Sequence, residues 1–328
     1  MAIQASNYIW KNGELIPWHE ATVHVLSHAL HYGSSVFEGI RVYDTPTGPA
    51  AFRLDDHIDR LFDSARIHRM PMPFARSALL KACHRVVMAN RLESAYLRPI
   101  VFRGYGGLGV VPDEDVATEV VVAAFCWGSY LGEEQMSRGV DVAVSSWQRP
   151  APNTLPALAK AGGNYLSGAL ISAEARRHGY HEGIGLSVDG LISEGAGENL
   201  FLVRDGVLHT PPMAASILGG ITRNSVLHLA ADLGLKVREQ HLPRELLYLA
   251  DELFFTGTAA EITPIRSVDG ITVRAGGRGP VTGALQEAFF GLFEGRTPDR
   301  HGWLTPMDAE ISTPKAEEVD HAGALHTV

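Results

Sequence analysis

The amino-acid sequence predicts an α+β protein with two domains. The chain has 328 residues, enough for roughly two domains of ordinary size. Segments with strand alternation and segments with helical periodicity follow one another without a steady strand–helix alternation, which argues against a doubly wound sheet. A hinge is expected at residues 127–132, after a strongly apolar segment. The expected parts are an N-terminal α/β domain at 1–127, a linker at 128–138, a C-terminal domain at 139–304 and an unstructured tail at 305–328.

The first domain is expected to open with a β-hairpin, because Asn12-Gly13 lies between two apolar segments and both residues tolerate positive φ. Helical periodicity follows at residues 54–68 and at 77–92, where Ser77 is a candidate N-cap. On the first of these helices Arg60 points away from the apolar stripe, so periodicity alone predicts an exposed arginine. The expected strands of this domain cover residues 8–10, 14–16, 36–42, 50–53, 95–102 and 119–127.

The second domain is expected to combine short strands with three helices. Asp189-Gly190 and Asp205-Gly206 indicate tight turns between strands. The expected strands cover residues 140–145, 184–188, 191–192, 200–203 and 252–256. The expected helices cover residues 164–178, 222–233 and 281–293. From about Thr305 the sequence is polar and without periodicity, which is typical of a disordered segment.

The composition is that of a soluble globular protein, with 45% hydrophobic and 20% charged residues. A net charge of -9 argues against binding to nucleic acid. The longest strongly apolar segment, residues 120–127, is too short to span a bilayer, and the N-terminus lacks a signal-peptide pattern. Cys83 and Cys126 show no metal-ligand spacing and are expected to be buried free thiols. No metal site is expected from the histidines either, and the protein is expected to be cytoplasmic.

Lys160 has the one lysine environment that could remove water from its amine. The chain has five lysines, and the other four lie in turns, on an amphipathic helix or in polar segments. Lys160 is surrounded by small and apolar residues just before Gly162-Gly163. Desolvation lowers a lysine pKa and so yields the neutral nucleophile that a Schiff base requires. The alternative is a loop lysine without chemistry.

If Lys160 forms a Schiff base, pyridoxal 5′-phosphate is the obvious aldehyde. A phosphate needs helix N-terminal amides, and Gly219-Gly220-Ile221-Thr222 begins a helix. Thr258 could add a hydroxyl. The pyridine nitrogen needs an acid, for which Glu194 and Glu198 are both candidates at this stage. Tyr165 could contact the ring hydroxyl.

Longer motifs support this interpretation. Glu194-Gly-Ala-Gly-Glu-Asn-Leu-Phe, followed by Leu208-His209-Thr210 and Leu218-Gly219-Gly220-Ile221-Thr222-Arg223, resembles the signature of the class IV (fold type IV) aminotransferases. Within that family the chain is most similar to the bacterial branched-chain amino acid aminotransferases, over about residues 7–303. This resemblance rests on the segments 31–41 (HYGSSVFEGIR), 96–99 (YLRP), 160–165 (KAGGNY) and 255–261 (FTGTAAE).

The resemblance implies a two-domain fold like that of D-amino acid aminotransferase, with the cofactor at the domain interface. It implies transamination between leucine, isoleucine or valine and 2-oxoglutarate, as in branched-chain amino acid biosynthesis. The catalytic residue would be Lys160. The cofactor-binding residues would be Arg60, Lys160, Tyr165, Glu194, Leu218, Ile221, Thr222, Gly257 and Thr258. The substrate-binding residues would be Tyr32, Phe37, Tyr96, Arg98, Val110, Trp127, Tyr130, Thr258, Ala259 and Ala260.

Individual roles follow from the same resemblance. Glu194 would pair with the pyridine nitrogen, and Arg60 would bind the phosphate, which overturns the exposed-arginine interpretation. Val110 would reach the pocket of a neighbouring subunit in a homo-oligomer, with a dimer as the minimal unit and often a hexamer in bacteria. Arg98, on the same strand face as Tyr96, would bind the γ-carboxylate of glutamate. A structural salt bridge is the alternative for Arg98.

Other functions are weighed against this one. Within the fold, a D-amino acid aminotransferase, an aminodeoxychorismate lyase and an amine transaminase are rivals, and the motifs at residues 31–33 and 96–98 argue against them. Outside it, a cofactor-free Schiff-base aldolase using Lys160 and a non-enzymatic metabolite-binding protein remain, and both predict a colourless protein.

Overall fold

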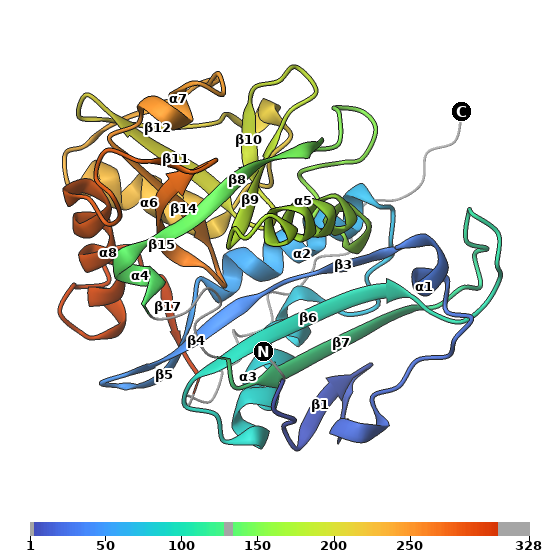
Figure 1. The fold of residues 1–328 in the computed structure, drawn as a ribbon. Coiled ribbons are helices and arrows are strands. Elements are labelled where there is room, and N and C mark those ends of the chain that lie inside the picture. Colours follow the sequence, from blue (N-terminus) through green and yellow to red (C-terminus); the bar gives the residue numbers. More distant parts are fainter. Residues whose placement is uncertain (1–2, 128–133, 308–328) are drawn as a thin grey trace, which may run out of the picture.

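The computed structural model describes residues 3–127 and 134–307, which form two β-sheets with helices packed against them (Figure 1). The first sheet has the strand order β17-β5-β4-β6-β7-β1-β2, with β3 paired to β6. Its strands are β1 (Tyr8–Lys11), β2 (Glu14–Pro17), β3 (Ser35–Phe37), β4 (Ile40–Thr45), β5 (Gly48–Phe52), β6 (Ala95–Arg103), β7 (Thr118–Phe125) and β17 (Leu304–Pro306).

The second sheet has the order β10-β9-β8-β15-β14-β11-β12-β13, with β16 paired to β15. Its parallel β8–β9, β8–β15 and β12–β13 pairs and its antiparallel pairs make it a mixed sheet. Its strands are β8 (Val140–Gln148), β9 (Glu182–Leu186), β10 (Ile192–Gly195), β11 (Asn199–Arg204), β12 (Val207–Thr210), β13 (Lys236–Glu239), β14 (Glu252–Gly257), β15 (Glu261–Val268) and β16 (Ile271–Thr272).

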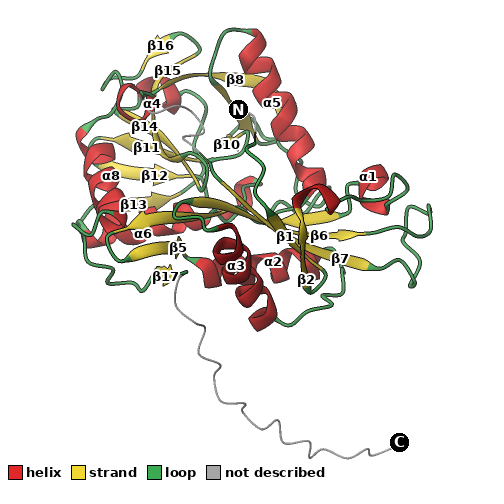
Figure 2. Ribbon diagram, turned by 90° about the horizontal axis from the view of Figure 1, so that it is seen from below, coloured by secondary structure: helices red, strands yellow, loops and turns green. Residues whose placement is uncertain are grey.

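Helices cover each sheet (Figure 2). In the first half α3 packs on β1, β6 and β7 and against α2, while in the second half α5 packs on β8 and β9, and α6 and α8 pack on β14. The helices are α1 (His28–Tyr32), α2 (Leu54–Ile67), α3 (Arg76–Asn90), α4 (Gln135–Arg138), α5 (Tyr165–Arg177), α6 (Ile221–Asp232), α7 (Leu246–Leu249) and α8 (Pro280–Phe293).

The amphipathic helix α2 links the two halves. Leu54, Ile58, Leu61 and Ala65 are fully or almost fully buried in the core of the first sheet, and their spacing is that of one helix face. The face turned away from this stripe is covered by the second half of the chain: Arg60 contacts the loop before α6. The exposure inferred from the helical wheel was therefore wrong for Arg60.

An aromatic cluster also joins the halves. Phe52 on β5 packs edge-to-face on Phe289 and Phe293 of α8 at centroid distances of 5.4 Å each. Tyr43 on β4 stacks on Phe293 at 3.5 Å. Burial of such large rings strongly stabilises a packed interface, so the two sheets form one continuous structure around the space between them.

Most predicted elements are confirmed within a few residues, and several details are corrected. Helix α3 begins at Arg76 after Ala75, without a side-chain cap, so Ser77 is not the N-cap. The unstructured tail was predicted to start too early: Leu304–Pro306 pair with β5 as β17, and Met307 is fully buried. Cys83 is buried as expected, whereas Cys126 is exposed.

Several elements were not predicted, among them α1, β13 and β15. Of the proposed hinge at residues 127–132, residues 128–132 lie outside the described residues, as does the chain beyond 307. The predicted domain boundaries stay a prediction. In the described part of the chain, no helix is both long and apolar enough to cross a membrane. No cluster of three or more metal-ligating side chains occurs there either.

Candidate active site

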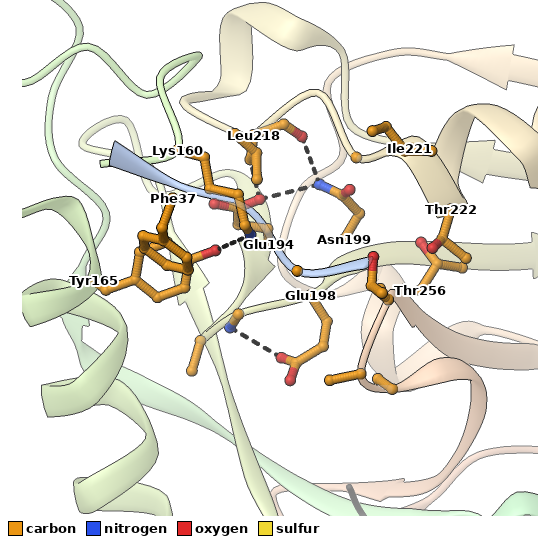
Figure 3. A pocket seen from close by; sticks show the side chains of 18 of the residues that line it. Phe37, Lys160, Tyr165, Glu194, Glu198, Asn199, Leu218, Ile221, Thr222 and Thr256 are labelled. Carbon is orange, nitrogen blue, oxygen red and sulfur yellow. Dashed lines mark hydrogen bonds between the residues drawn. The ribbon is translucent and has the colours of Figure 1, made fainter. Parts of the chain in front are cut away.

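A cavity of about 250 Å³ lies where the two halves meet, and almost all of the predicted site residues line it. Figure 3 shows it from close by. The predicted residues in its wall are Phe37, Arg60, Tyr96, Arg98, Trp127, Lys160, Tyr165, Glu194, Leu218, Ile221, Thr222, Gly257, Thr258, Ala259 and Ala260.

Two predicted residues of the described chain, Tyr32 and Val110, are not in this wall. The Tyr32 hydroxyl donates to the Leu108 carbonyl at 2.7 Å, and the Tyr32 side chain does not line the cavity. Val110 is 75% exposed and does not reach the cavity of its own chain. It lies on the glycine-rich loop, residues 104–111, which follows β6. Its contact with a neighbouring subunit stays a prediction. Tyr130 lies outside the described residues.

Backbone contacts from the first half hold Lys160 in place. The Phe37 N–H group donates to the Lys160 carbonyl at 3.0 Å, and the Lys160 N–H group donates to Ser64 Oγ on α2 at 3.0 Å. The flanking Ala159 and Ala161 are 1% exposed each. The Lys160 backbone therefore cannot shift without disturbing the core of the first sheet.

The Lys160 amine faces aromatic rings and one hydroxyl. Its Nζ donates to the Tyr165 hydroxyl at 2.6 Å and lies 5.1 Å from the Phe37 ring centroid (Figure 3). Burial, and then the positive charge of Arg60, lower the pKa of Lys160 to about 8. Burial also raises the pKa of Tyr165, so this residue stays a neutral phenol at neutral pH. The site thus supplies an amine that is partly neutral near physiological pH.

Glu194 is held by three donors. Its Oε1 pairs with Arg149 Nη2 at 2.6 Å, and its Oε2 accepts from Asn199 Nδ2 and from the Leu218 N–H group at 3.0 Å each. Asn199 also donates to the Leu218 carbonyl at 2.9 Å. Burial raises the pKa of Glu194, and the Arg149 charge counteracts this shift. A further cation beside the carboxylate would favour its ionised form.

Glu198, the other candidate for the ring nitrogen, is in a different environment. Its carboxyl accepts one hydrogen bond, from the Gly197 N–H group at 3.0 Å. Burial, and then repulsion by Glu182, raise the pKa of Glu198 to about 8. At neutral pH Glu198 therefore mostly keeps its proton, which suits it less than Glu194 to balance a cation.

The start of α6 forms an anion-binding corner. Gly220 is the N-cap, and the first-turn N–H groups of Ile221 and Thr222 have no partner within the helix. A Cβ on Gly220 would lie 1.9 Å from Asn199 Oδ1, so a glycine is needed here. Arg60 Nη1 donates to the Gly219 carbonyl at 2.8 Å, which brings a guanidinium to the same corner.

The part of the wall formed by the predicted substrate-binding residues is aromatic with one arginine. Arg98 Cζ lies 4.8 Å from the Phe37 ring centroid and 5.2 Å from that of Tyr96. Arg98 Nε and Trp127 Nε1 are buried without a hydrogen-bond partner within the described chain. Arg98 has no carboxylate within salt-bridge distance there, which argues against the structural salt bridge considered for it.

These features fit a phosphorylated aromatic aldehyde. The amine, the acid and the anion-binding corner all line one cavity. Thr256 Oγ1 and Arg149 Nε are additional buried polar atoms without a partner in the described part of the chain. Buried polar groups normally find partners, so these atoms in the wall are available to a polar ligand.

Sequence reasoning missed Arg149, Asn199 and Glu38 as members of the site. Asn199 and Glu38 belong to the segments that carried the family resemblance, but no role was assigned to either. Arg149 follows β8 and is far from Glu194 in the chain, so no local pattern could have associated the two residues.

Comparison with known proteins agrees with this geometry. Residues 35–268 match the family model described as amino-transferase class IV. The branched-chain-amino-acid aminotransferase of Salmonella typhimurium is 59% identical over 309 residues, which cover 94% of this chain and 100% of that protein. A probable branched-chain-amino-acid aminotransferase of Aquifex aeolicus is 34% identical and covers 92% of this chain and 97% of its own length.

Solved structures give the same result. The Escherichia coli branched-chain amino acid aminotransferase superposes with a TM-score of 0.92 at 58% identity, over 93% of this chain and 100% of that one. The branched-chain amino acid aminotransferase from Thermobaculum terrenum, in its PLP-bound holo-form, superposes with a TM-score of 0.86 at 37% identity, over 93% and 99% of the two chains. The chain therefore belongs to the class IV aminotransferases.

Proposed function

We propose that this chain transfers the amino group between branched-chain L-amino acids (leucine, isoleucine and valine) and 2-oxoglutarate, with pyridoxal 5′-phosphate as cofactor. The products are branched 2-oxo acids and L-glutamate. The observation that carries this proposal is the buried Lys160 amine, which shares one cavity with Glu194 and the start of α6. The branched-chain-amino-acid aminotransferases of Salmonella typhimurium and Escherichia coli, both 59% identical to this chain, agree with it.

Each part of the cofactor has a matching group in the cavity. Glu194 would hold the ring nitrogen and Tyr165 the ring hydroxyl, and Lys160 would be the residue that binds the cofactor covalently. The phosphate would be held by Arg60, Thr222, Thr258 and the free N–H groups at the start of α6. When bound, pyridoxal phosphate supplies an aldehyde carbon and a ring that accepts electron density from the substrate α-carbon. Leu218, Ile221 and Gly257 would complete its surroundings.

Lys160 also acts as the acid–base group. With cofactor and substrate bound, the Lys160 amine would take the proton from the substrate α-carbon. Its lowered pKa is close to the operating pH, which favours transfer in both directions. The hydroxyl of Tyr165 lies 2.6 Å from Nζ and keeps the amine directed into the cavity.

Two kinds of side chain must fit one substrate pocket. The rings of Phe37, Tyr96 and Trp127 provide an apolar wall for leucine-like side chains. The guanidinium of Arg98 lies against two of these rings and provides a cation for the γ-carboxylate of glutamate. The Thr258-Ala259-Ala260 segment borders the same space. Tyr32 and Tyr130 belong to the proposed substrate site through the family resemblance alone.

The full chain should turn over L-leucine with 2-oxoglutarate and show the visible absorbance of a lysine-bound pyridoxal. Lys160→Ala should lose this absorbance band and lower kcat at least about 10³-fold, because it removes the covalent and acid–base group. Lys236→Ala, on the exposed strand β13, is the matched control and should change neither. Equal or better turnover of D-alanine or aminodeoxychorismate would contradict the proposed substrate class, and a colourless protein would contradict the cofactor.

Arg98→Met should separate the two half-reactions. It removes the cation and keeps the apolar stem, so the KM for 2-oxoglutarate should rise about 10- to 100-fold, the usual effect of losing a hydrogen bond to a charged group. Single turnover with L-leucine should change less than about threefold on the same reasoning. Arg85→Met, on the exposed side of α3, is the control. Equal losses in both half-reactions would assign Arg98 a structural role.

We further propose a cytoplasmic homo-oligomer with a dimer as the minimal unit, able to form hexamers. Four apolar residues of α1 and its neighbouring loops are between 62% and 80% exposed: Val25, Leu30, Val110 and Val111. His28 Nε2 bonds to the Gly109 carbonyl at 2.9 Å, so α1 and the glycine-rich loop form one surface. Exposed apolar surface of this kind is typical of an interface. Light scattering should report a dimer or larger, and a monomer would contradict the proposal.

A further inference from the structure

A fully buried carboxylate lies behind the arginine assigned to the phosphate. Glu38 directly follows β3 and is 0% exposed. Its Oε1 accepts from Arg60 Nε at 2.6 Å, and its Oε2 accepts from Arg60 Nη2 at 2.9 Å. His57, one helical turn before Arg60 on α2, contributes a third contact, from Nδ1 to Oε2 at 2.6 Å. Both carboxylate oxygens of Glu38 thus accept hydrogen bonds from one edge of the Arg60 guanidinium.

The buried environment determines the protonation states of Glu38 and His57. Burial alone would raise the pKa of Glu38, but the charge of Arg60 and the contacts with His57 outweigh it and hold this pKa well below its usual range. Burial lowers the pKa of His57 more than Glu38 raises it, so the imidazole is neutral at neutral pH and donates its Nδ1–H. One ionised carboxylate therefore faces one guanidinium.

The remaining nitrogen of the Arg60 guanidinium, Nη1, contacts the second half of the chain. Arg60 Nη1 donates to the Gly219 carbonyl at 2.8 Å, immediately before the N-cap of α6. The three bonds leave one N–H of Nη1 and one of Nη2 for a ligand, since a guanidinium has five N–H groups. Arg60 lines the cavity, so these remaining donors lie beside the start of α6.

We propose that Glu38 is a positioning residue that fixes the Arg60 guanidinium for the cofactor phosphate, and that it thereby sets the preference for phosphorylated over unphosphorylated pyridoxal. The inference rests on the proposed function. A long arginine side chain loses much conformational freedom when it binds a ligand, and a preset guanidinium has already lost it. The carboxylate also offsets part of the positive charge, so its benefit to phosphate binding lies in geometry.

The test compares two probes on the full chain: pyridoxal phosphate and pyridoxal, which lacks the phosphate. Binding of each is followed by the visible absorbance of the lysine-bound form. Glu38→Gln keeps the shape of the side chain but places an amide N–H group opposite the N–H donors of Arg60 or His57. The bidentate pair between the carboxylate and the guanidinium is thereby lost. It should raise the Kd for pyridoxal phosphate about 10-fold or more and the Kd for pyridoxal less than about twofold. In an Arg60→Met background the same substitution should not change the ratio of the two Kd values any further.

Matched variants keep the test decisive. Asp59→Asn is the control, because Asp59 lies on the same helix and pairs with Arg76 of α3, and neither residue lines the cavity. It should leave the ratio of the two affinities unchanged. Glu38→Asp keeps the charge but shortens the reach, so it should lower the ratio to a lesser extent. If Glu38→Gln does not fold, the affinity ratio of Glu38→Asp is the deciding measurement.

The contrary results are distinct. If wild type prefers pyridoxal phosphate in an Arg60-dependent way, and both Glu38 variants keep that preference while losing thermal stability, Glu38 is a structural anchor and this inference is overturned. If the wild-type chain forms no Lys160-dependent absorbance band with either probe, the proposed function fails, and the role of Glu38 fails with it.

Discussion

The burial of one lysine amine between two halves of the chain is the constraint on which the rest of the site depends. Lys160 is tied by its backbone to β3 and α2, and its amine lies against the rings of Phe37 and Tyr165. Without both halves the amine would be hydrated and would hold its proton at neutral pH. The aromatic contacts that join the sheets therefore contribute to the chemistry as well as to stability.

Paired charges surround this amine and define what the cavity can accept. Arg60 is matched by Glu38, and Arg149 by Glu194. Removing one member of such a buried pair would leave an uncompensated buried charge, so a single substitution in either pair would destabilise the fold. Arg98 has no carboxylate partner in the described structure, which leaves its charge to a ligand. The arrangement suits a cofactor with one phosphate and a substrate that is alternately apolar and anionic.

Local periodicity predicted helices α2, α6 and α8 because their apolar faces repeat at helical spacing. It did not predict β15, where Glu261, Pro264 and Arg266 interrupt the alternation. The helical wheel shows only that Arg60 lies off the apolar face of α2. It contains no information about the second half of the chain, which covers Arg60. Contiguous motifs and the family resemblance identified most of the cavity wall. The pairing of Arg149 with Glu194 required tertiary structure.

The most direct test of this account is the pH dependence of Schiff-base formation between the cofactor-free full chain and pyridoxal. A Lys160 pKa of about 8 makes about a tenth of the amine neutral at pH 7, against about one part in 3,000 for an ordinary lysine. The rate should rise about tenfold per pH unit below pH 8 and level off above it. A rate that keeps rising to pH 10 would show a hydrated amine and contradict the account.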